Sequence, residues 1–398
     1  MTVTAEDVAA ARERIADVAR PTPVLPSATL TDQLGAPVGL KAENLQRTGS
    51  FKVRGAANKV SALGPRCAAG VVAGSAGNHA QALAHAARAR GVPCEVFMPQ
   101  SAPLSKIEGA EALGAKVTVG GDSVIECLAA ATARAEEAGM TVVHPFDDPD
   151  VIAGQGTLGL ELLDAVPDLA KVVVPIGGGG LASGVAIAVK SARPEVDVVG
   201  VQVETCAPFA GQAPGSARTL TIADGIAVKR PGRITLPLVQ QWVDDVVTVS
   251  EDEVAEAIVL LMERAKQVVE GAGAVGVAAL MAGKTGPAAD GTTVAILSGG
   301  NVDAGLLAEV ARRHETEMGR RLVVLTRISD RPGALARLLS VVGEEGANLI
   351  EVQHVREGLD SHVRETAVQL ILETRGRDHA DAVLEAMRGD GYAARVLR

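Results

Sequence analysis

The strongest constraint on the fold is the alternation of short Val- and Ile-rich runs with Ala-rich stretches over residues up to about 310. GVVAG at 70–74 is followed by HAQALAHAARARG, and KVVVPI at 171–176 is followed by LASGVAIAVKSA. Each pair predicts a strand, a glycine-containing turn and a helix, and the runs at 197–204, 245–250 and 293–300 predict further strands. The order predicts an α/β fold, with parallel sheets covered by helices on both faces.

The pattern changes at 311–321. The sequence ARRHETEMGRR is charged and has no long apolar face, so we interpret it as a linker. Residues 322–398 then predict strand, helix, strand, strand, helix and strand, a βαββαβ unit. A chain of 398 residues also exceeds what one hydrophobic core usually holds. Two units are therefore expected, one over 1–310 and one over 322–398.

Composition excludes several classes of partner. The formal net charge is -10, and no Lys/Arg run is interleaved with aromatic residues, so nucleic acid is not expected as a partner. No apolar run is long enough to span a bilayer, and the N-terminus has no signal-peptide core, so a cytoplasmic protein without membrane contact is expected. The four cysteines, Cys67, Cys94, Cys127 and Cys206, lack CxxC spacing, which predicts neither a zinc site nor disulfides.

The segment TGSFKVRGAANK, 48–59, places Lys52 between Phe51 and Val53. A lysine at such a position is usually a surface charge at a helix start. A lysine that attacks a carbonyl group, however, has to be partly desolvated so that its amine is neutral often enough. The apolar neighbours of Lys52 offer that setting, which makes it a candidate nucleophile.

Four consecutive glycines stand at 177–180 in VVVPIGGGGLASG, between a predicted strand and a predicted helix. Residues without a Cβ let several backbone N–H groups face one phosphate, and the helix dipole adds to the attraction. No Lys-Ser/Thr pair follows, so this is not a Walker loop. The acidic residue of a dinucleotide fingerprint is also missing from its expected place. A phosphate monoester is favoured over a dinucleotide.

Two further segments end predicted strands. SAGNHAQ, 75–81, opens a helix whose free N–H groups suit a carboxylate, although Gly77-Asn78 could equally close an ordinary turn. AILSGGN, 295–301, puts Ser298 at the carboxyl end of a strand, where open α/β sheets bind ligands. Its hydroxyl could meet a ring nitrogen, or Ser298 could be an ordinary serine at a strand end.

In this order, SFKVRGA, SAGNHAQ, GGGGL and SGGN resemble the threonine/serine dehydratase branch of the pyridoxal-phosphate enzymes related to the tryptophan synthase β-subunit. The resemblance covers about 5–310 and extends to 144–157, 222–232 and 270–276. It implies a tryptophan synthase β-like fold with two open parallel α/β subdomains, the smaller inserted in the larger at about 45–145.

The same resemblance implies roles for individual residues. Lys52 would carry pyridoxal 5'-phosphate and then take the substrate's Cα proton as a general base. The other cofactor contacts would be Phe51 on a ring face, Asn78 at the ring hydroxyl, Gly177, Gly178, Gly179, Gly180 and Leu181 around the phosphate, Glu270 near the ring and Ser298 at the ring nitrogen. The substrate, a small amino acid, would be held by Ser75, Ala76, Gly77 and Asn78.

The implied reaction is β-elimination of L-threonine to 2-oxobutanoate and ammonia, with L-serine to pyruvate as a secondary activity. The neutral hydroxyl of Ser298 would not keep a ring nitrogen protonated, which favours elimination over transamination. Ala76 stands where the resembling serine racemases carry a second serine, which disfavours racemisation. The alternatives are a serine racemase or β-replacement synthase of the same family, and a catalytically silent amino-acid-sensing protein.

Two regulatory features complete the expectations. Racemase-like relatives bind a divalent cation through a glutamate and an aspartate six residues later. Here Glu204 is followed at that distance by Ala210, so no metal is expected and Glu204 is the only candidate ligand. The stretch 330–352 resembles the ACT domains, small amino-acid-binding regulatory modules. This resemblance implies an amino-acid effector near Gly333 and Asn348 and a homodimer or homotetramer, unless the unit serves only to oligomerise.

Overall fold

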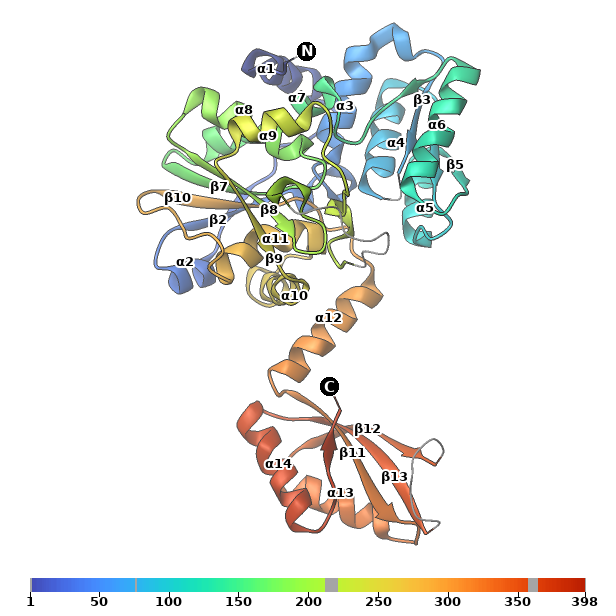
Figure 1. Cartoon of the computed structure of the whole chain (residues 1–398), viewed down its shortest axis with the longest axis vertical. Coiled ribbons are helices and arrows are strands. Elements are labelled where there is room, and N and C mark those ends of the chain that lie inside the picture. Colours follow the sequence, from blue (N-terminus) through green and yellow to red (C-terminus); the bar gives the residue numbers. More distant parts are fainter. Residues whose placement is uncertain (1, 76, 212–220, 357–363, 398) are drawn as a thin grey trace. The chain divides into compact units, whose positions relative to one another are not determined.

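The computed structural model describes residues 2–75, 77–211, 221–356 and 364–397. By its contacts the chain divides into two compact units, Met1–Asp303 and Ala304–Arg398 (Figure 1). Ala76, one of the residues expected to hold the substrate, lies outside the described residues. Within the described ranges, no helix has the length and apolar character needed to cross a membrane.

The larger sheet of the first unit has the strand order β1-β2-β10-β7-β8-β9, and every neighbouring pair except β1–β2 is parallel. Its strands are β1 (Val24–Pro26), β2 (Val38–Ala42), β7 (Leu169–Pro175), β8 (Asp197–Val203), β9 (Asp245–Val249) and β10 (Thr292–Leu297). The expected parallel sheet is confirmed, with one antiparallel strand added at its edge.

Helices cover both faces of this sheet (Figure 1). On one face lie α1 (Ala5–Ile15), α7 (Pro149–Ala165), α8 (Gly180–Ala192) and α9 (Thr235–Trp242), and on the other lie α2 (Ala28–Leu34), α10 (Glu251–Leu260) and α11 (Gly271–Met281). Because both faces are covered, β2 is buried at every position and β10 at all but its first.

Helix α10 begins as expected and ends earlier than expected. Ser250 and Glu253 form the predicted capping box. The apolar run up to 269 predicted one continuous helix, but the chain passes through a π-helical turn, Leu261–Ala265, and Lys266 has a φ of 56°. The remaining residues leave the helix and lead to Glu270, whose backbone N–H donates to the carbonyl of Gly299.

The smaller sheet is entirely parallel, in the order β5-β4-β3-β6. Its elements are β3 (Val71–Gly74), β4 (Cys94–Met98), β5 (Lys116–Val119) and β6 (Thr141–Val142), with α3 (Lys52–Leu63), α4 (Asn78–Arg90), α5 (Leu104–Ala112) and α6 (Val124–Ala138). Val71 packs in the cluster that includes α3 and α4, whereas Val72 packs in the cluster that includes α6. Since α3 also packs on α7, it joins the two sheets.

The second unit contains the expected βαββαβ order, which is confirmed. Its elements are β11 (Arg321–Ser329), α13 (Ala334–Glu344), β12 (Asn348–Val355), β13 (Glu365–Glu373), α14 (Arg377–Gly389) and β14 (Arg395–Val396). The sheet is antiparallel with the order β12-β13-β11-β14. Leu338 and Val342 of α13 and Val383 and Met387 of α14 are buried in its core.

The segment 311–321, expected to be an irregular linker, is helical over most of its length. Helix α12 (Ala304–Glu317) runs through it, and the division between the units falls at Asp303 rather than at 310. Arg312 pairs with Glu309 and Arg313 with Glu317. Such pairs three or four residues apart support a helix, so the charges that suggested a linker stabilise α12 instead.

Candidate active site

The first and fourth motifs lie against each other. Ser50 forms a β-bridge with Gly299, and the backbone N–H of Phe51 donates to the carbonyl of Ser298 at 3.0 Å. The carboxyl end of β10 therefore holds the residues that precede α3. Lys52 begins α3, so its position depends directly on this contact.

Lys52 presents a buried amine. Its Nζ donates to the carbonyl oxygen of Pro145 at 3.2 Å and lies 5.0 Å from the centre of the Phe51 ring. Burial lowers the pKa of Lys52 to about 8, although the charge of Glu270 acts in the opposite direction. A large fraction of the amine is therefore neutral near neutral pH, as a nucleophilic or proton-accepting lysine requires.

The second motif is tied to the same place by Asn78, the first residue of α4. Its Nδ2 donates to Oε1 of Glu270 at 2.7 Å, and its Oδ1 accepts from Nδ2 of Asn301 at 2.9 Å. Asn301 in turn donates to the carbonyl of Thr48 at 2.7 Å. This chain of hydrogen bonds joins the starts of α4 and α11 to the loop before α3.

Glu270 is an acid in an apolar setting, at the N-terminal cap of α11. Burial and the nearby charge of Asp224 raise the pKa of Glu270 to about 7, against the opposing effects of Lys106, Asn78 and Lys52. A carboxyl with such a pKa exchanges a proton near neutral pH.

The loop before α4 has the character expected of an anion site. Ser75 is largely buried, and its Oγ accepts from the backbone N–H of Gly77 at 3.3 Å. The first turn of α4 leaves its backbone N–H groups without partners inside the helix. Ser75, Gly77 and Asn78 are thus brought together beside Glu270.

Packing explains why the third motif consists of glycines. A Cβ on Gly178 would overlap the ring of Phe146, and a Cβ on Gly179 would lie 2.9 Å from Cβ of Thr235. Gly179 also has a φ of 91°, which side chains disfavour. Because Pro145 accepts from Lys52 and Phe146 packs on Gly178, this loop and Lys52 meet the same short segment.

The glycine loop offers a set of free donors. No backbone carbonyl of the described residues accepts from the amides of Gly177, Gly178 or Gly179. Gly180 and Leu181 open α8, so their amides have no partner within the helix. Such a cluster at a helix N-terminus binds phosphate groups.

Ser298 follows β10 and is 2% exposed. Its Oγ donates to the carbonyl of Ala272 in α11 at 3.4 Å, a long hydrogen bond. The hydroxyl is therefore held only loosely and is free to reorient towards a ring nitrogen.

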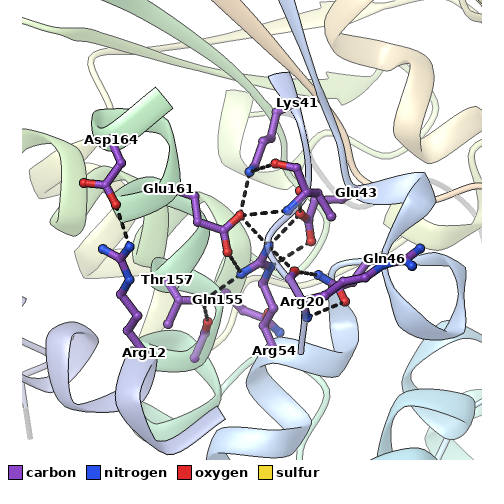
Figure 2. A network of polar contacts seen from close by, with 12 residues as sticks. Arg12, Arg20, Lys41, Glu43, Gln46, Arg54, Gln155, Thr157, Glu161 and Asp164 are labelled. Atoms are coloured by element: carbon purple, nitrogen blue, oxygen red, sulfur yellow. Dashed lines mark hydrogen bonds and ion pairs between the residues drawn. The ribbon is translucent and has the colours of Figure 1, made fainter. Parts of the chain in front are cut away.

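A buried ionic network stands behind Lys52 and fixes α3 (Figure 2). Arg54 binds Glu43 through Nε and Nη2, each at 2.8 Å, and binds Glu161 of α7 through Nη1 at 2.6 Å. Lys41 of β2 also reaches Glu161, at 2.6 Å. Burial lowers the pKa of Arg54, but the charges and hydrogen bonds of both glutamates raise it further, so Arg54 stays charged.

The expected metal candidate stands apart from these residues. Glu204 lies exposed in the turn after β8, and its backbone N–H donates to the carbonyl of Val249. Throughout the part of the chain that the structure describes, no three His, Cys, Asp or Glu side chains gather as metal ligands would.

The two candidate effector residues are separated within one copy of the chain. Gly333 caps the start of α13 with a φ of 86°, and Asn348 begins β12 after that helix ends. A helix of 11 residues spans about 16 Å. One small ligand bound to a single copy would therefore not contact both residues.

Sequence reasoning missed three parts of the site. Asn301 stands inside the SGGN motif, so its amide was available as a signal. Pro145 and Phe146 belong to a segment that matches dehydratases but carries no reactive group. Lys106, whose charge acts on Glu270, gave no signal, because its position depends on how α5 packs.

Comparison with known proteins agrees with this arrangement. Residues 15–299 match the family model described as pyridoxal-phosphate dependent enzyme. The L-threonine ammonia-lyase of Thermotoga maritima is 44% identical over 402 residues, which cover 99% of this chain and 100% of that protein. The L-threonine ammonia-lyase of Geobacter sulfurreducens is 44% identical over 98% of each chain.

Two solved structures are similar to the first unit. A threonine deaminase from a source given as T.th. has a TM-score of 0.71 and 42% identity, covering 75% of this chain and 99% of that one. Maize serine racemase has a TM-score of 0.74 and 34% identity, covering 80% of this chain and 99% of that one. With its motifs gathered around a buried lysine, this chain belongs to the family of pyridoxal-phosphate-dependent enzymes.

Proposed function

We propose that the chain is an L-threonine ammonia-lyase that converts L-threonine to 2-oxobutanoate and ammonia, with L-serine to pyruvate as a secondary activity. The observation that carries the proposal is the identity of 44% to an L-threonine ammonia-lyase across both units of the chain. The buried amine of Lys52 and the four motifs around it supply groups suited to that chemistry.

The residues present fit pyridoxal 5'-phosphate. The amides of Gly177 to Leu181 provide free donors for its phosphate. Ser183, one turn into α8, has a buried Oγ without a hydrogen-bond partner among the described residues, as expected of a group that awaits a ligand. Lys52 would hold the cofactor covalently beside Phe51, with Asn78 and Glu270 at the polar edge of the ring and Ser298 at its nitrogen.

The bound cofactor supplies an electron sink that makes the substrate's Cα–H bond acidic. Ser75, Gly77 and Asn78 hold the substrate carboxylate, and the Lys52 amine takes the Cα proton. The electron pair left at Cα forms the Cα–Cβ double bond, and the Cβ hydroxyl leaves with a proton as water. The unsaturated amine product then takes up one water and releases ammonia, which leaves 2-oxobutanoate.

The direct experiment is to add L-threonine to the purified protein and follow 2-oxobutanoate. The proposal expects product from L-threonine at a higher kcat/KM than pyruvate from L-serine. The similarity to maize serine racemase makes racemisation the competing activity. Formation of D-serine from L-serine without 2-oxobutanoate from L-threonine would contradict the proposal.

We further propose that the second unit is an ACT-like regulatory domain in a homodimer or homotetramer, with an amino-acid effector bound between copies. The βαββαβ order and the separation of Gly333 from Asn348 support a site shared by two chains. Light scattering with and without branched-chain amino acids tests this proposal. A monomer whose activity no amino acid changes would contradict it.

A further inference from the structure

Lys106 is a cation near the candidate site that none of the motifs contains. It lies in the first turn of α5, and its Nζ pairs with Oδ2 of Asp224 at 3.1 Å. The side chain of Lys106 is only 12% exposed, whereas that of Asp224 is 61% exposed. Ion pairs with a solvated partner contribute little free energy, so Lys106 can exchange Asp224 for another anion at little cost.

Lys106 also lies against the loop that precedes α4. A Cβ on Gly77 would stand 3.6 Å from Nζ of Lys106 and 3.9 Å from its Cδ. The ammonium group is therefore in contact range of the backbone between Ser75 and Asn78. Its charge also lowers the pKa of Glu270, which shows that its field reaches the interior of the site.

A second link anchors the same helix turn. Ser105 donates from Oγ to Oδ1 of Asp303 at 3.0 Å, in the segment after β10. The start of α5 thus meets the part of the chain that belongs to the larger sheet at two points, Asp224 and Asp303. Lys106 is held over the mouth of the site by these contacts.

We propose that Lys106 binds the carboxylate of the amino-acid substrate and gives up its ion pair with Asp224 when the substrate enters. The loop amides alone offer neutral donors, whereas an ammonium group adds a charge-assisted hydrogen bond, the stronger kind. Asp224 then acts as a competitor for Lys106 in the free enzyme. The inference rests on the proposed function, because it requires a substrate with a free carboxylate.

The test compares K106Q, K106R and D224N with the wild-type holoenzyme. L-alanine, which has no hydroxyl to eliminate, is titrated while the absorbance of the bound cofactor is followed, and KM and kcat are measured for L-threonine. A pH of about 8.5 keeps Glu270, with its pKa of about 7, ionised in every variant. Loss of one charged hydrogen bond is expected to weaken L-alanine binding and raise KM in K106Q by about tenfold or more, with kcat little changed.

The partner variant gives the sharper result. D224N is expected to tighten L-alanine binding and lower KM, the opposite direction from K106Q, and K106R is expected to retain most of the affinity. The control is K116Q, since Lys116 is an exposed lysine of β5 paired with Glu95, and it is expected to match the wild type.

A purely structural ion pair would weaken binding in both K106Q and D224N, and that result, or an unchanged affinity in K106Q, would overturn the proposal. If K106Q does not fold, K106R and D224N still decide between these outcomes. A wild-type enzyme that binds L-alanine but makes no 2-oxobutanoate would contradict the proposed function alone.

Discussion

Asn78 and Glu270, 192 positions apart in the chain, are joined by a hydrogen bond of 2.7 Å from Asn78 Nδ2 to Glu270 Oε1. Asn78 opens a helix of the smaller sheet and Glu270 caps a helix of the larger one. The bond therefore joins the two subdomains at the point where Lys52 is buried. It also fixes an acid with a raised pKa next to an amine with a lowered one.

The charge of Glu270 sets the protonation of Lys52, which E270Q tests. The neutral fraction of the amine rises as the pH increases through its pKa of about 8, and the negative charge of Glu270 raises that pKa. The cofactor-free protein is thus expected to take up pyridoxal phosphate faster as the pH rises, and the midpoint should move to lower pH in E270Q. The exposed E204Q is the control; a midpoint that moves upward in E270Q would contradict the assignment.

Arg54 is predicted to be essential for stability. Replacing it by methionine leaves Glu43 and Glu161 buried without their shared partner, which costs about 3–5 kcal/mol of unfolding free energy. R54K should recover only part of the loss, because lysine cannot bind both carboxylates with a planar fork.

Thermal and denaturant unfolding measure this effect, with R12Q as the matched control. Arg12 pairs with Asp164 at the exposed edge of the same region (Figure 2), and its loss should change stability by less than about 1 kcal/mol. Equal destabilisation by R54M and R12Q would show that the buried network is not what holds α3.

G178A is predicted to disrupt the glycine loop. Its new methyl group would overlap the Phe146 ring, so the loop or Phe146 has to move, at a cost of about 1–3 kcal/mol. Pyridoxal phosphate should then raise the melting temperature less than it does in the wild type. G276A is the control, because a methyl there would meet Val173 O at an ordinary 3.4 Å. An unchanged response to the cofactor in G178A would argue against this loop as the phosphate site.

Asn301 is predicted to position Asn78. N301A removes the donor to Asn78 Oδ1, which leaves the amide free to rotate away from Glu270. An unsatisfied buried group of this kind costs on the order of 1–3 kcal/mol, so kcat/KM should fall by about tenfold or more. N301D keeps an acceptor-only side chain of the same size and should not restore activity. Full activity in both variants would remove Asn301 from the site.

Much of this arrangement follows from the sequence because parallel strands carry ligands at their carboxyl ends. Ser75 and Ser298 each follow a strand of a parallel sheet, and their motifs meet through Asn78, Glu270 and Asn301. The glycine run was recognisable because only residues without a Cβ fit beside Phe146 and Thr235.

Other features depend on packing that local patterns do not encode. The contact of Lys106 with Gly77 arises from the placement of α5. The partners of Arg54 come from Glu43 and from Glu161, far along the chain. The helical character of 311–317 depends on charge pairs that resemble, in composition, a solvated linker.

The central claim is that Lys52 holds the cofactor of an L-threonine ammonia-lyase. Reducing the holoenzyme with borohydride, digesting it and locating the pyridoxyl group by peptide mass spectrometry tests this most directly. The account predicts the added mass on Lys52 alone, with 2-oxobutanoate production from L-threonine lost in step with the modification. A pyridoxyl group on another lysine, or full activity after Lys52 is modified, would contradict it.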